Sequence, residues 1–559
     1  MAQTVAEVLW DVLAAHGVQQ VFGIPGDSID LLLDPLKRDP RIKFVQVRHE
    51  EAGAFMASAY AKKTGRLGVC MGTAGPGAIH LLNGLYDAKL DHAPVLAITG
   101  QVGLPYIGTD FFQEIDTLGL YNQVALYNQQ VIDPDQIAVM ADLACRQALA
   151  KRGVVHLSFP FEVPRQKVHA DIERHNVADH IRDSMPVPDV LDEAAARIDK
   201  SERPVILAGR GALSARLELA ALADRAQIPV VNTLPAKGVL PDDHPLTLGG
   251  LGLLGAKPAH QAMESCDLCL LVGTNYPYLE FLPEKADIIQ IDWEASQIGK
   301  RHLVDLGLVG SARPTLAALA ERVRPRSGSP WAERLAADRK HWLKQLTDEA
   351  HRDVRPEGPV NPKLVADVLS RTAAHDANIA VDVGNALVWM SRGFRIRQHG
   401  WLVSAWLGSM AFGVPAAIAA KIAEPDRQSI AVVGDGAMGM MLGDFVTALK
   451  YEWPITVVVL NNQKLGMIKF EQEVNGMPEF ATDLYNPDFA AYARACGGQG
   501  YRVDRPADLQ EALLAALAAS TSAIVDVLVD PNVKPMPPRI TFDQARGYAQ
   551  AMFREALHV

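Results

Sequence analysis

Short apolar runs rich in β-branched residues alternate with helix-length segments along nearly the whole chain. A run such as Val457–Leu460 has no polar residue at alternate positions, which is typical of a strand buried on both faces. Strands of this kind separated by helices predict an α/β fold built from doubly wound parallel sheets. The predicted strands are Gln20–Ile24, Lys43–Val47, Gly68–Met71, Pro94–Thr99, Pro204–Leu207, Pro229–Asn232, Leu268–Val272, Ile288–Ile291, Ile379–Val383, Ser429–Val433, Ile455–Leu460 and Ala523–Val529.

Two polar stretches interrupt this alternation and divide the chain into three units. Residues 163–188 are polar with proline near both ends, and residues 324–362 are charged, proline-rich at their ends, and contain a short predicted helix. We interpret both stretches as linkers. The first and third units look alike in architecture, although their sequences do not superimpose by eye. The predicted domains are residues 1–165, 186–325 and 360–535, followed by a tail helix in residues 536–559.

Charge and apolar content exclude several classes of protein. Lysine and arginine number 54 against 65 aspartate and glutamate residues, so the net charge is −11, without a basic block that would favour nucleic acid. No uncharged apolar run reaches the roughly 18 residues of a membrane span, and the N-terminus predicts an amphipathic helix and not a signal peptide. Five scattered cysteines predict the reducing cytoplasm, with Cys266 and Cys269 as buried structural thiols.

The strongest chemical signal is Gly434-Asp435-Gly436, followed after 24 residues by Asn461-Asn462. Each motif follows a predicted parallel strand, and the carboxyl ends of such strands are where open α/β sheets bind ligands. Aspartate and asparagine oxygens suit Mg²⁺, which usually bridges phosphates, and the glycines allow the backbone to approach a diphosphate at a helix N-terminus. The alternative is two unrelated turns, because both sequences are common in turns.

At this spacing, GDG followed by NN resembles the thiamine diphosphate motif of the decarboxylase, oxidase and acetolactate synthase superfamily. The segments that resemble its pyrimidine-binding domain are VFGIPGDS (21–28), RHEEAGAFMASAYA (48–61), TAGPGAIHLLNGLYDA (73–88), APVLAITGQ (93–101) and IGTDFFQE (107–114). Within the superfamily the chain is most similar to pyruvate oxidases and quinone-linked pyruvate dehydrogenases. The segments that resemble their FAD-binding middle domain are PAKG (235–238), GTNYPY (273–278), IIQID (288–292) and IGKRH (298–302).

The resemblance implies how metal and coenzyme are held. Asp435, Asn462 and the backbone carbonyl of Lys464 would bind Mg²⁺. Glu50 would hydrogen-bond N1′ of the aminopyrimidine, which favours the imino form that takes the C2 proton of the thiazolium. The resulting ylid attacks a 2-keto acid, and the ring accepts the electrons of decarboxylation. Taken alone, Glu50 is better interpreted as an ordinary solvated carboxylate at the start of a helix, where negative charge is favoured.

Further positions follow from the same resemblance. Met410 matches the bulky apolar residue that folds the coenzyme into its V shape, although by itself it reads as a core methionine. Asp382-Val-Gly-Asn385 ends another predicted strand and lines the same crevice. The predicted contacts to thiamine diphosphate, besides the metal ligands, are Gly26, Asn385, Gly408, Ser409, Met410, Gly434, Gly436, Ala437, Leu465, Gly466 and Met467.

Glu50 and Asp435 are 385 residues apart in the sequence. In the superfamily these two halves of the site come from different subunits. The resemblance therefore implies a homodimer at minimum, and we predict a homotetramer.

His80, Phe112, Gln113 and Glu471 occupy positions where pyruvate oxidases carry active-site residues. Acetolactate synthases tend to have asparagine in place of His80, whose imidazole is suited to orienting a keto-acid carboxylate or donating a proton. The alternatives are a helix histidine near a turn and a solvated Glu471 within a charged segment. Met467 departs from the phenylalanine expected in these oxidases, which leaves the electron acceptor open.

The FAD prediction depends on three turns that follow strands of the middle unit. Gly209-Arg210-Gly211 is a glycine turn suited to a phosphate, although it lacks the third glycine of the dinucleotide fingerprint. Asp292 and Glu294 are placed to accept hydrogen bonds from ribose or adenine groups. The remaining predicted contacts are Asn275, Tyr276 and Pro277. The alternative is a middle domain that keeps the fold and binds no flavin.

We therefore predict an enzyme that binds thiamine diphosphate, Mg²⁺ and FAD and oxidatively decarboxylates pyruvate or a similar small 2-keto acid. Neither nucleic acid nor integral membrane contact is expected. A first alternative is a carboligase that joins the decarboxylated keto acid to a second carbonyl compound. A second alternative is a non-catalytic relative, which is expected to lack Glu50, Asp435 or Asn462, and all three are present.

Overall fold

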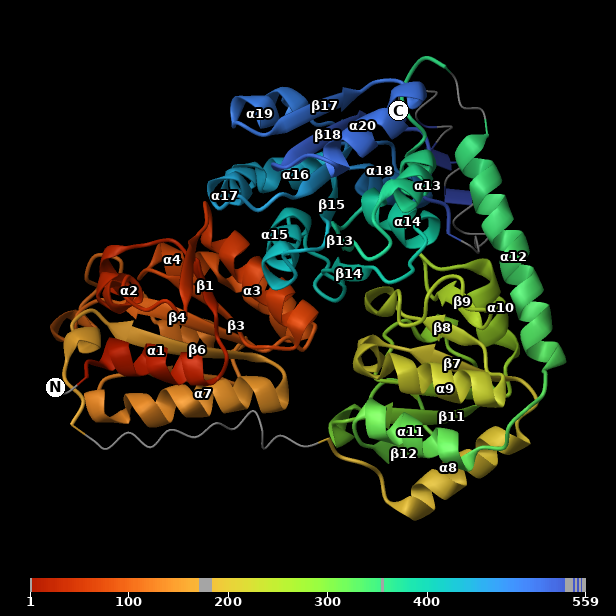
Figure 1. Ribbon diagram of the computed structural model, residues 1–559, viewed down its shortest axis with the longest axis horizontal. Helices are drawn as coiled ribbons and strands as arrows, with labels where there is room; N and C mark the ends of the chain where they lie inside the picture. Colours follow the sequence, from red (N-terminus) through yellow and green to blue (C-terminus); the bar gives the residue numbers. More distant parts are fainter. Residues whose placement is uncertain are drawn as a thin grey trace.

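The computed structural model describes residues 3–169, 183–352 and 356–537, together with Arg546, Gly547, Gln550, Ala551 and Arg554. Three six-stranded sheets follow one another along the chain (Figure 1), and all paired strands within them are parallel. Helices lie on both faces of the sheets. The α/β class with doubly wound parallel sheets is therefore confirmed.

The first sheet has the strand order β2-β1-β3-β4-β6-β5. Its strands are β1 (Gln20–Gly23), β2 (Lys43–Gln46), β3 (Gly68–Gly72), β4 (Val95–Gln101), β5 (Tyr127–Gln130) and β6 (Val154–Pro160). Its helices are α1 (Val5–Ala15), α2 (Asp30–Leu36), α3 (Glu50–Thr64), α4 (Pro76–His80), α5 (Leu82–Leu90), α6 (Thr117–Tyr121) and α7 (Ile137–Lys151). The amphipathic N-terminal helix is present as α1, and a capping box between Thr4 and Glu7 stabilises its N-terminus.

The second sheet has the strand order β12-β11-β10-β7-β8-β9. Its strands are β7 (Pro204–Ala208), β8 (Val230–Asn232), β9 (Thr247–Gly250), β10 (Leu268–Val272), β11 (Asp287–Asp292) and β12 (Leu306–Val309). Its helices are α8 (Pro188–Lys200), α9 (Arg216–Ala226), α10 (Lys257–Ser265) and α11 (Ala312–Arg322). Cys266 and Cys269 are buried, unpaired thiols at the start of β10, as the sequence predicts.

The third sheet has the order β14-β13-β15-β16-β18-β17, which repeats the pattern of the first sheet. Its strands are β13 (Asn378–Val381), β14 (Gly400–Val403), β15 (Ser429–Gly434), β16 (Thr456–Asn461), β17 (Gln499–Val503) and β18 (Ala523–Leu528). Its helices are α13 (Pro362–Thr372), α14 (Asn385–Gly393), α15 (Gly413–Ala423), α16 (Asp435–Met440), α17 (Phe445–Lys450), α18 (Gly466–Val474), α19 (Phe489–Ala495) and α20 (Leu509–Leu517). The first and third units therefore have the same sheet topology, in line with the expected likeness of their architecture.

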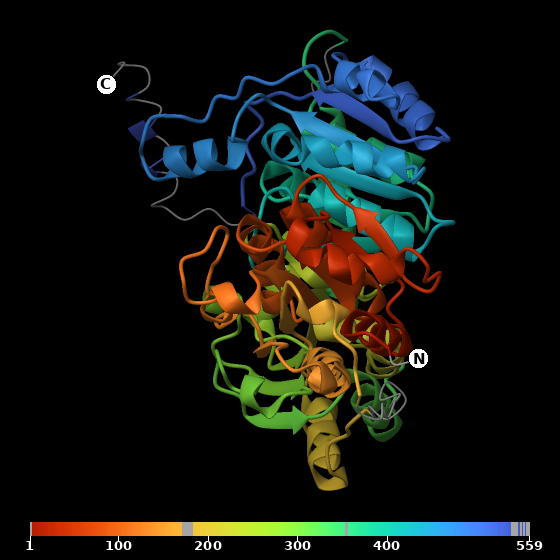
Figure 2. The ribbon, with the colours of Figure 1, turned by 90° about the vertical axis from the view of Figure 1, so that its left-hand side faces the viewer.

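The first and third units share one hydrophobic core. Helix α3 is rich in alanine and almost wholly buried, and it packs on α15 of the third unit. Phe55 of α3 meets Phe412 edge to face, with ring centroids 5.8 Å apart. The side view of Figure 2 shows the third unit, in cyan and blue, directly above the first unit, in red. Small side chains on both helices allow the close approach that joins the two units.

Helix α12 (Pro330–His351) is longer than the short helix expected in residues 324–362. It has 22 residues and runs along the second and third units at the right of Figure 1. Trp331, Leu335 and Arg339 recur every four residues on its buried face, and the Trp331 indole donates to the Pro204 carbonyl at 3.1 Å. Charged residues between these positions conceal this stripe in the sequence.

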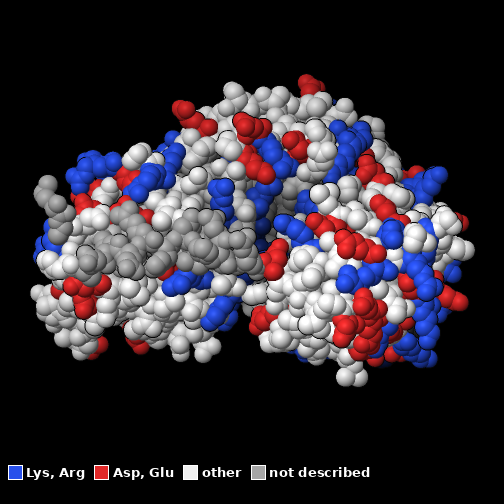
Figure 3. Space-filling model, turned by 60° about the horizontal axis from the view of Figure 1, so that its bottom comes forward, with Lys and Arg blue, Asp and Glu red and all other residues white. Residues whose placement is uncertain are grey.

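The three sheets lie within the predicted domains, residues 1–165, 186–325 and 360–535, whose boundaries stay a prediction. Residues 170–182 of the first predicted linker, and most of the predicted tail helix in residues 536–559, lie outside the described residues. Among helices in the described residues, none combines the length and apolar character that crossing a membrane requires. Acidic and basic side chains are intermixed on the face shown in Figure 3.

Candidate functional site

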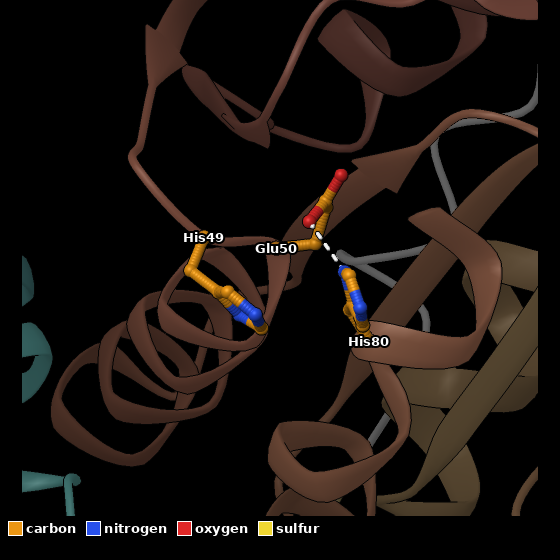
Figure 4. A group of neighbouring side chains, drawn as sticks. All are labelled: His49, Glu50 and His80. Atoms are coloured by element: carbon orange, nitrogen blue, oxygen red, sulfur yellow. Dashed lines mark hydrogen bonds and ion pairs between the residues drawn. The ribbon is translucent and has the colours of Figure 1, made fainter. Parts of the chain in front are cut away.

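A carboxylate and two imidazoles meet at the start of α3 (Figure 4). Glu50 is the first residue of α3 and is buried, and its Oε2 lies 3.0 Å from Nδ1 of His80, the last residue of α4. His49 is the N-cap of α3, where its Nδ1 accepts a hydrogen bond from the Glu51 amide at 3.2 Å. The His49 and His80 rings have centroids 4.5 Å apart. The first unit thus presents an acid–base pair at one position.

The turn before α4 brings the predicted substrate residues toward this pair. Gly75 has φ +64°, and a Cβ there would lie 3.0 Å from the carbonyl oxygen of Gln113. The loop that contains Gln113 therefore packs against the start of the helix that ends in His80. Phe112 is 75% exposed in the same loop. Within the described residues, neither side chain has a hydrogen bond or ion pair with Glu50.

The two strand-end motifs of the third unit lie side by side. β15 pairs with β16 in parallel, so Asp435 and Asn462 emerge at the same sheet edge. Asp435 is 2% exposed, and burial raises its pKa to about 6 while the Asn486 hydrogen bond lowers it. Asn486 Nδ2 donates to Asp435 Oδ2 at 2.7 Å. The sequence-predicted oxygen donors therefore lie at one edge of the sheet, with Asp435 buried and Asn462 half-buried.

Gly466 marks a close approach at this edge. A Cβ there would lie 2.5 Å from Nδ2 of Asn385 and 2.6 Å from Nδ2 of Asn462, so the two amides border one narrow space. The Oδ1 atom of Asn385 is buried and has no hydrogen-bond partner among the described residues. An unpartnered buried acceptor beside Asn462 fits a site that a cation or hydrogen-bond donor completes.

The loop between β14 and α15 bridges the two units. Met410 Cε lies 3.2 Å from where a Cβ on Gly436 would stand, so Met410 covers the start of α16. Ser409 Oγ accepts a hydrogen bond from Asn83 of the first unit at 3.0 Å, and Asn83 follows His80 by three residues. Gly408 has φ +68°, a conformation that favours glycine.

Asp382 holds the end of that loop. It follows β13, is 1% exposed, and accepts backbone hydrogen bonds from Val383 at 2.8 Å and Gly413 at 2.9 Å. Burial raises its pKa to about 7, and the backbone hydrogen bonds lower it. Between Met410 and Gly413, Ala411 takes φ +75°, which is unusual for a residue with a side chain. Asp382 thus fixes a strained loop that carries Met410.

The segment after Asn462 is held by charge pairs. The Lys464 amide donates to Asn462 Oδ1 at 3.1 Å, and its ammonium pairs with Glu479 at 2.8 Å and with Asp483. Glu471 lies on α18 with an exposed side chain. Glu473, two residues later, is buried and pairs with Lys534 at 2.5 Å.

The remaining positions predicted for this coenzyme fall on the same two units. Leu465 and Gly466 begin α18, and Met467 packs on the core of the third unit. Gly434 ends β15, and Ala437 is buried in α16. Gly26 follows β1 in the first unit, where a Cβ would collide with Thr73.

The middle unit presents its own cluster at the carboxyl ends of β7, β10 and β11. A Cβ on Gly209 would lie 2.4 Å from the Gly273 carbonyl oxygen, and one on Gly211 2.8 Å from Gly273 Cα, so the two turns touch. Arg210 is half-buried, and desolvation lowers its pKa, whereas the charges of Asp91 and Asp87 raise it. Asp292 ends β11 and is buried, which raises its pKa. The other predicted residues here are Asn275, Tyr276 and Pro277, which follow β10, and Glu294, which follows β11.

Three buried polar atoms in this cluster have no hydrogen-bond partner among the described residues: Arg210 Nη1, Thr233 Oγ1 and Tyr276 Oη. They follow β7, β8 and β10, which are neighbours in the second sheet. Buried polar groups are normally hydrogen-bonded. Their arrangement, with one guanidinium and two hydroxyls at one sheet edge, suits a polar ligand that carries phosphate.

Sequence reasoning missed three of the residues in these clusters. Asn486 follows no motif and reaches Asp435 from a loop 51 residues later. His49 directly precedes Glu50, and its value as a helix cap is a signal that the sequence contains. Thr233 follows a predicted strand, which makes it a candidate on position alone.

Comparison with known proteins agrees with this geometry. Family models of thiamine pyrophosphate enzymes match residues 3–120 (N-terminal TPP binding domain), 191–319 (central domain) and 382–527 (C-terminal TPP binding domain). YdaP of Bacillus subtilis (strain 168), whose name refers to thiamine pyrophosphate, is 41% identical over 99% of this chain and 96% of its own. Pyruvate oxidase of Lactiplantibacillus plantarum is 35% identical, covering 96% and 90%. Acetolactate synthase large subunit of Parasynechococcus marenigrum is 34% identical, covering 95% and 89%. The chain therefore belongs to the thiamine pyrophosphate enzymes, in the superfamily that includes pyruvate oxidases and acetolactate synthases.

Proposed function

We propose that the chain is a Mg²⁺- and FAD-dependent enzyme that oxidatively decarboxylates pyruvate or a similar small 2-keto acid. The observation that carries the proposal is the Glu50–His80 pair, at 3.0 Å, in a chain that belongs to the thiamine pyrophosphate enzymes. When bound, thiamine diphosphate supplies a nucleophilic ring carbon and an acceptor for the electron pair that decarboxylation releases. The protein residues hold that ring, orient the keto acid and exclude water.

Mg²⁺ and the diphosphate are assigned to the third unit. Asp435, Asn462 and the Lys464 carbonyl would hold the metal, because they offer the oxygen donors that it prefers. The donor set fits, since Asp435 is buried without a cationic partner among the described residues and Asn385 Oδ1 has no partner. Met410, whose side chain lies over Gly436, would support the coenzyme ring.

Glu50 would accept a hydrogen bond from the aminopyrimidine nitrogen. Because its carboxylate is buried, that bond is stronger than it would be in water. His80 is half exposed beside it and would bind the carboxylate of the keto acid or hold a proton for it. We assign Phe112, Gln113 and Glu471 to the substrate side of the site, with Phe112 covering it.

A second copy of the chain completes the site in this proposal. Among the described residues, no hydrogen bond or ion pair joins Glu50 to Asp435 or Asn462 of the same chain. Phe112 is 75% exposed on the first unit and Phe480 79% exposed on the third, and a partner subunit would cover such side chains. We propose a homodimer at minimum and a homotetramer in the cytoplasm.

FAD is assigned to the middle unit. Arg210, Thr233 and Tyr276 each have a buried polar atom without a hydrogen-bond partner in the described part of the chain, which fits a phosphate and ribose at this edge. Asp292 and Glu294 would accept hydrogen bonds from sugar or adenine groups. We assign the glycine turn, Gly209-Arg210-Gly211, and the turn Asn275-Tyr276-Pro277 to the same ligand.

A carboligase of the acetolactate synthase type is the second candidate. The 34% identity to an acetolactate synthase large subunit, over 95% of this chain, favours it as well. Anaerobic addition of pyruvate to the protein loaded with thiamine diphosphate, Mg²⁺ and FAD separates the two. Oxidative decarboxylation predicts bleaching of the flavin absorption and release of acetate or acetyl phosphate. Lasting yellow colour with a new carbon–carbon bond in the product would assign the carboligase.

A further inference from the structure

His49, Glu50 and His80 form a cluster with a property that the proposed reaction does not use. One ligand atom from each residue lies within 4.8 Å of the others. In the part of the chain that the structure describes, this is the one such group of three histidine, cysteine or acidic residues. Figure 4 shows the His80 imidazole bonded to the Glu50 carboxylate, with the His49 ring beside them. We propose that this cluster is a binding site for a divalent transition-metal ion such as Zn²⁺.

The distances are close to those of a metal site. Zn²⁺ binds imidazole nitrogen and carboxylate oxygen at about 2.0–2.2 Å, so tetrahedral neighbours stand about 3.3 Å apart. Glu50 Oε2 and His80 Nδ1 already stand 3.0 Å apart. His49 must then approach by at most about 1.5 Å to complete the set. Its side chain is 44% exposed, so a rotation about its own bonds is sufficient.

The donor set selects among metals. Two imidazoles and one carboxylate leave a fourth position for water, which is a common arrangement for Zn²⁺. Mg²⁺ prefers oxygen ligands only, so the site discriminates against the metal proposed for the third unit. His80 is 42% exposed at its side chain, and an ion therefore reaches the cluster from solvent in the single chain.

The Glu51 carboxylate lies next to the imidazole of His49. Glu51 Oε2 lies 4.0 Å from Nδ1 of His49, and Asn83 Nδ2 donates to Glu51 Oε1 at 2.5 Å. For His49 to bind a metal through Nε2, its Nδ1 must carry the proton, so the ring must turn away from the Glu51 amide that it now caps. The Glu51 carboxylate, 4.0 Å from Nδ1, is then the acceptor for that proton. Such outer partners orient metal-binding histidines and raise their basicity.

Metal bound here would occupy Glu50. Whether the metal competes with the coenzyme depends on the proposed function, in which Glu50 contacts the aminopyrimidine. A metal on Glu50 and the coenzyme ring then exclude each other, so Zn²⁺ would compete with thiamine diphosphate. Binding of the metal itself does not depend on that assignment.

The test uses the full-length chain freed of coenzyme and metal by dialysis against a chelator. Co²⁺ is titrated in as a spectroscopic probe, and Zn²⁺ is then added to displace it. We expect one Co²⁺ per chain with the intense visible absorption of a four- or five-coordinate ion. His49→Asn keeps a helix-capping oxygen and removes the imidazole, and we expect it to bind at least about tenfold more weakly.

Two further variants make the result specific. His351→Asn changes a histidine paired with Asp367 outside the cluster, and we expect Co²⁺ affinity equal to that of the parent. Circular dichroism of His49→Asn establishes that α3 is intact. Equal Co²⁺ affinity of the parent and His49→Asn, or the weak pale spectrum of an octahedral ion, would overturn the site.

Competition is measured separately, as the thiamine diphosphate affinity with and without Zn²⁺. We expect Zn²⁺ to weaken coenzyme binding in the parent and to have at least about tenfold less effect in His49→Asn. Metal binding that depends on His49 but leaves coenzyme affinity unchanged supports the metal site and contradicts the proposed role of Glu50. The two hypotheses therefore fail by different results.

Discussion

Asn486 donates a hydrogen bond from Nδ2 to Oδ2 of Asp435 at 2.7 Å, across 51 residues of sequence. The same Nδ2 also donates to Oδ1 of Asn461 at 3.4 Å, and Nδ2 of Asn461 donates to Oδ1 of Asp526 at 3.0 Å. Asp526 is buried and pairs with Arg502 at 2.6 Å. Asp435 is therefore held in one orientation by a chain of polar contacts that runs through the sheet.

Asn486→Ala is expected to weaken Mg²⁺-dependent binding of thiamine diphosphate. Outer partners of metal ligands typically contribute roughly 10- to 100-fold in metal affinity, because they fix the ligand before the metal arrives. Titration of Mg²⁺ at fixed coenzyme, followed by calorimetry, measures the change. Asn475→Ala is the control, because the Asn475 side chain donates to the backbone carbonyl of Glu471 at 2.9 Å, outside the Asp435 contacts. Equal affinities of the two variants would contradict a positioning role for Asn486.

Glu50→Gln is expected to lower keto-acid turnover by roughly 10²- to 10⁴-fold, the usual effect of losing a positioned proton-transfer group. Glutamine has the same shape and still accepts a hydrogen bond from His80, so the thermal midpoint is expected to stay near that of the parent. Glu51→Gln is the matched control one residue away, outside the Glu50–His80 pair. Turnover of Glu50→Gln as fast as that of Glu51→Gln would remove Glu50 from the reaction.

Asp382 is expected to make stability depend on pH. Burial raises its pKa to about 7 in the folded chain, above the value of about 3.9 in an unfolded chain. A raised pKa stabilises the fold fully below the unfolded value, and this contribution is lost as the pH rises through about 7. Asp382→Asn does not titrate, so the parent should lose thermal stability relative to this variant from about pH 4 to about pH 7.

Thermal midpoints of the parent and Asp382→Asn across that range provide the measurement. Asp444→Asn is a useful comparison, because burial also raises the pKa of Asp444, which accepts a hydrogen bond from the Arg48 amide at 3.0 Å. A constant difference in midpoint between the parent and Asp382→Asn would show that Asp382 does not titrate in this window.

The central strands were predictable from the sequence, and most edge strands were not. Every predicted strand is present, with ends displaced by at most two residues. Of the strands not predicted, β5, β9, β12, β14 and β17 are at sheet edges, and β6 is internal. β5 and β17 are polar and largely outside the core, and β9, β12 and β14 are four-residue strands that contain glycine, which weakens a strand pattern. In β6, His156 and Ser158 interrupt the run, and both are buried through hydrogen bonds.

Some residues of the candidate site were predictable from the sequence, and others were not. Asp435 and Asn462 were predictable, because each directly follows a buried strand and parallel strands end at one edge. Asn486 was not, because it reaches the site from a loop whose path depends on tertiary packing. The contact of Ser409 with Asn83 also joins residues 326 apart, which no local pattern encodes. The sequence pattern thus predicted the site residues at strand ends. The loop residues that complete the site could be identified only in the structure.

Arg210→Gln is expected to weaken FAD binding by roughly 10- to 100-fold, because a charge-assisted hydrogen bond to phosphate contributes about 1.5–3 kcal/mol. The free protein should not lose stability, since burial without a full set of partners disfavours the guanidinium and already lowers its pKa. Flavin content after purification and the dissociation constant for added FAD measure the effect. Arg203→Gln, at an exposed arginine before β7, is the control. If the two variants bind FAD equally and Arg210→Gln unfolds at a lower temperature than the parent, Arg210 serves the fold of the middle unit and the phosphate must be held elsewhere.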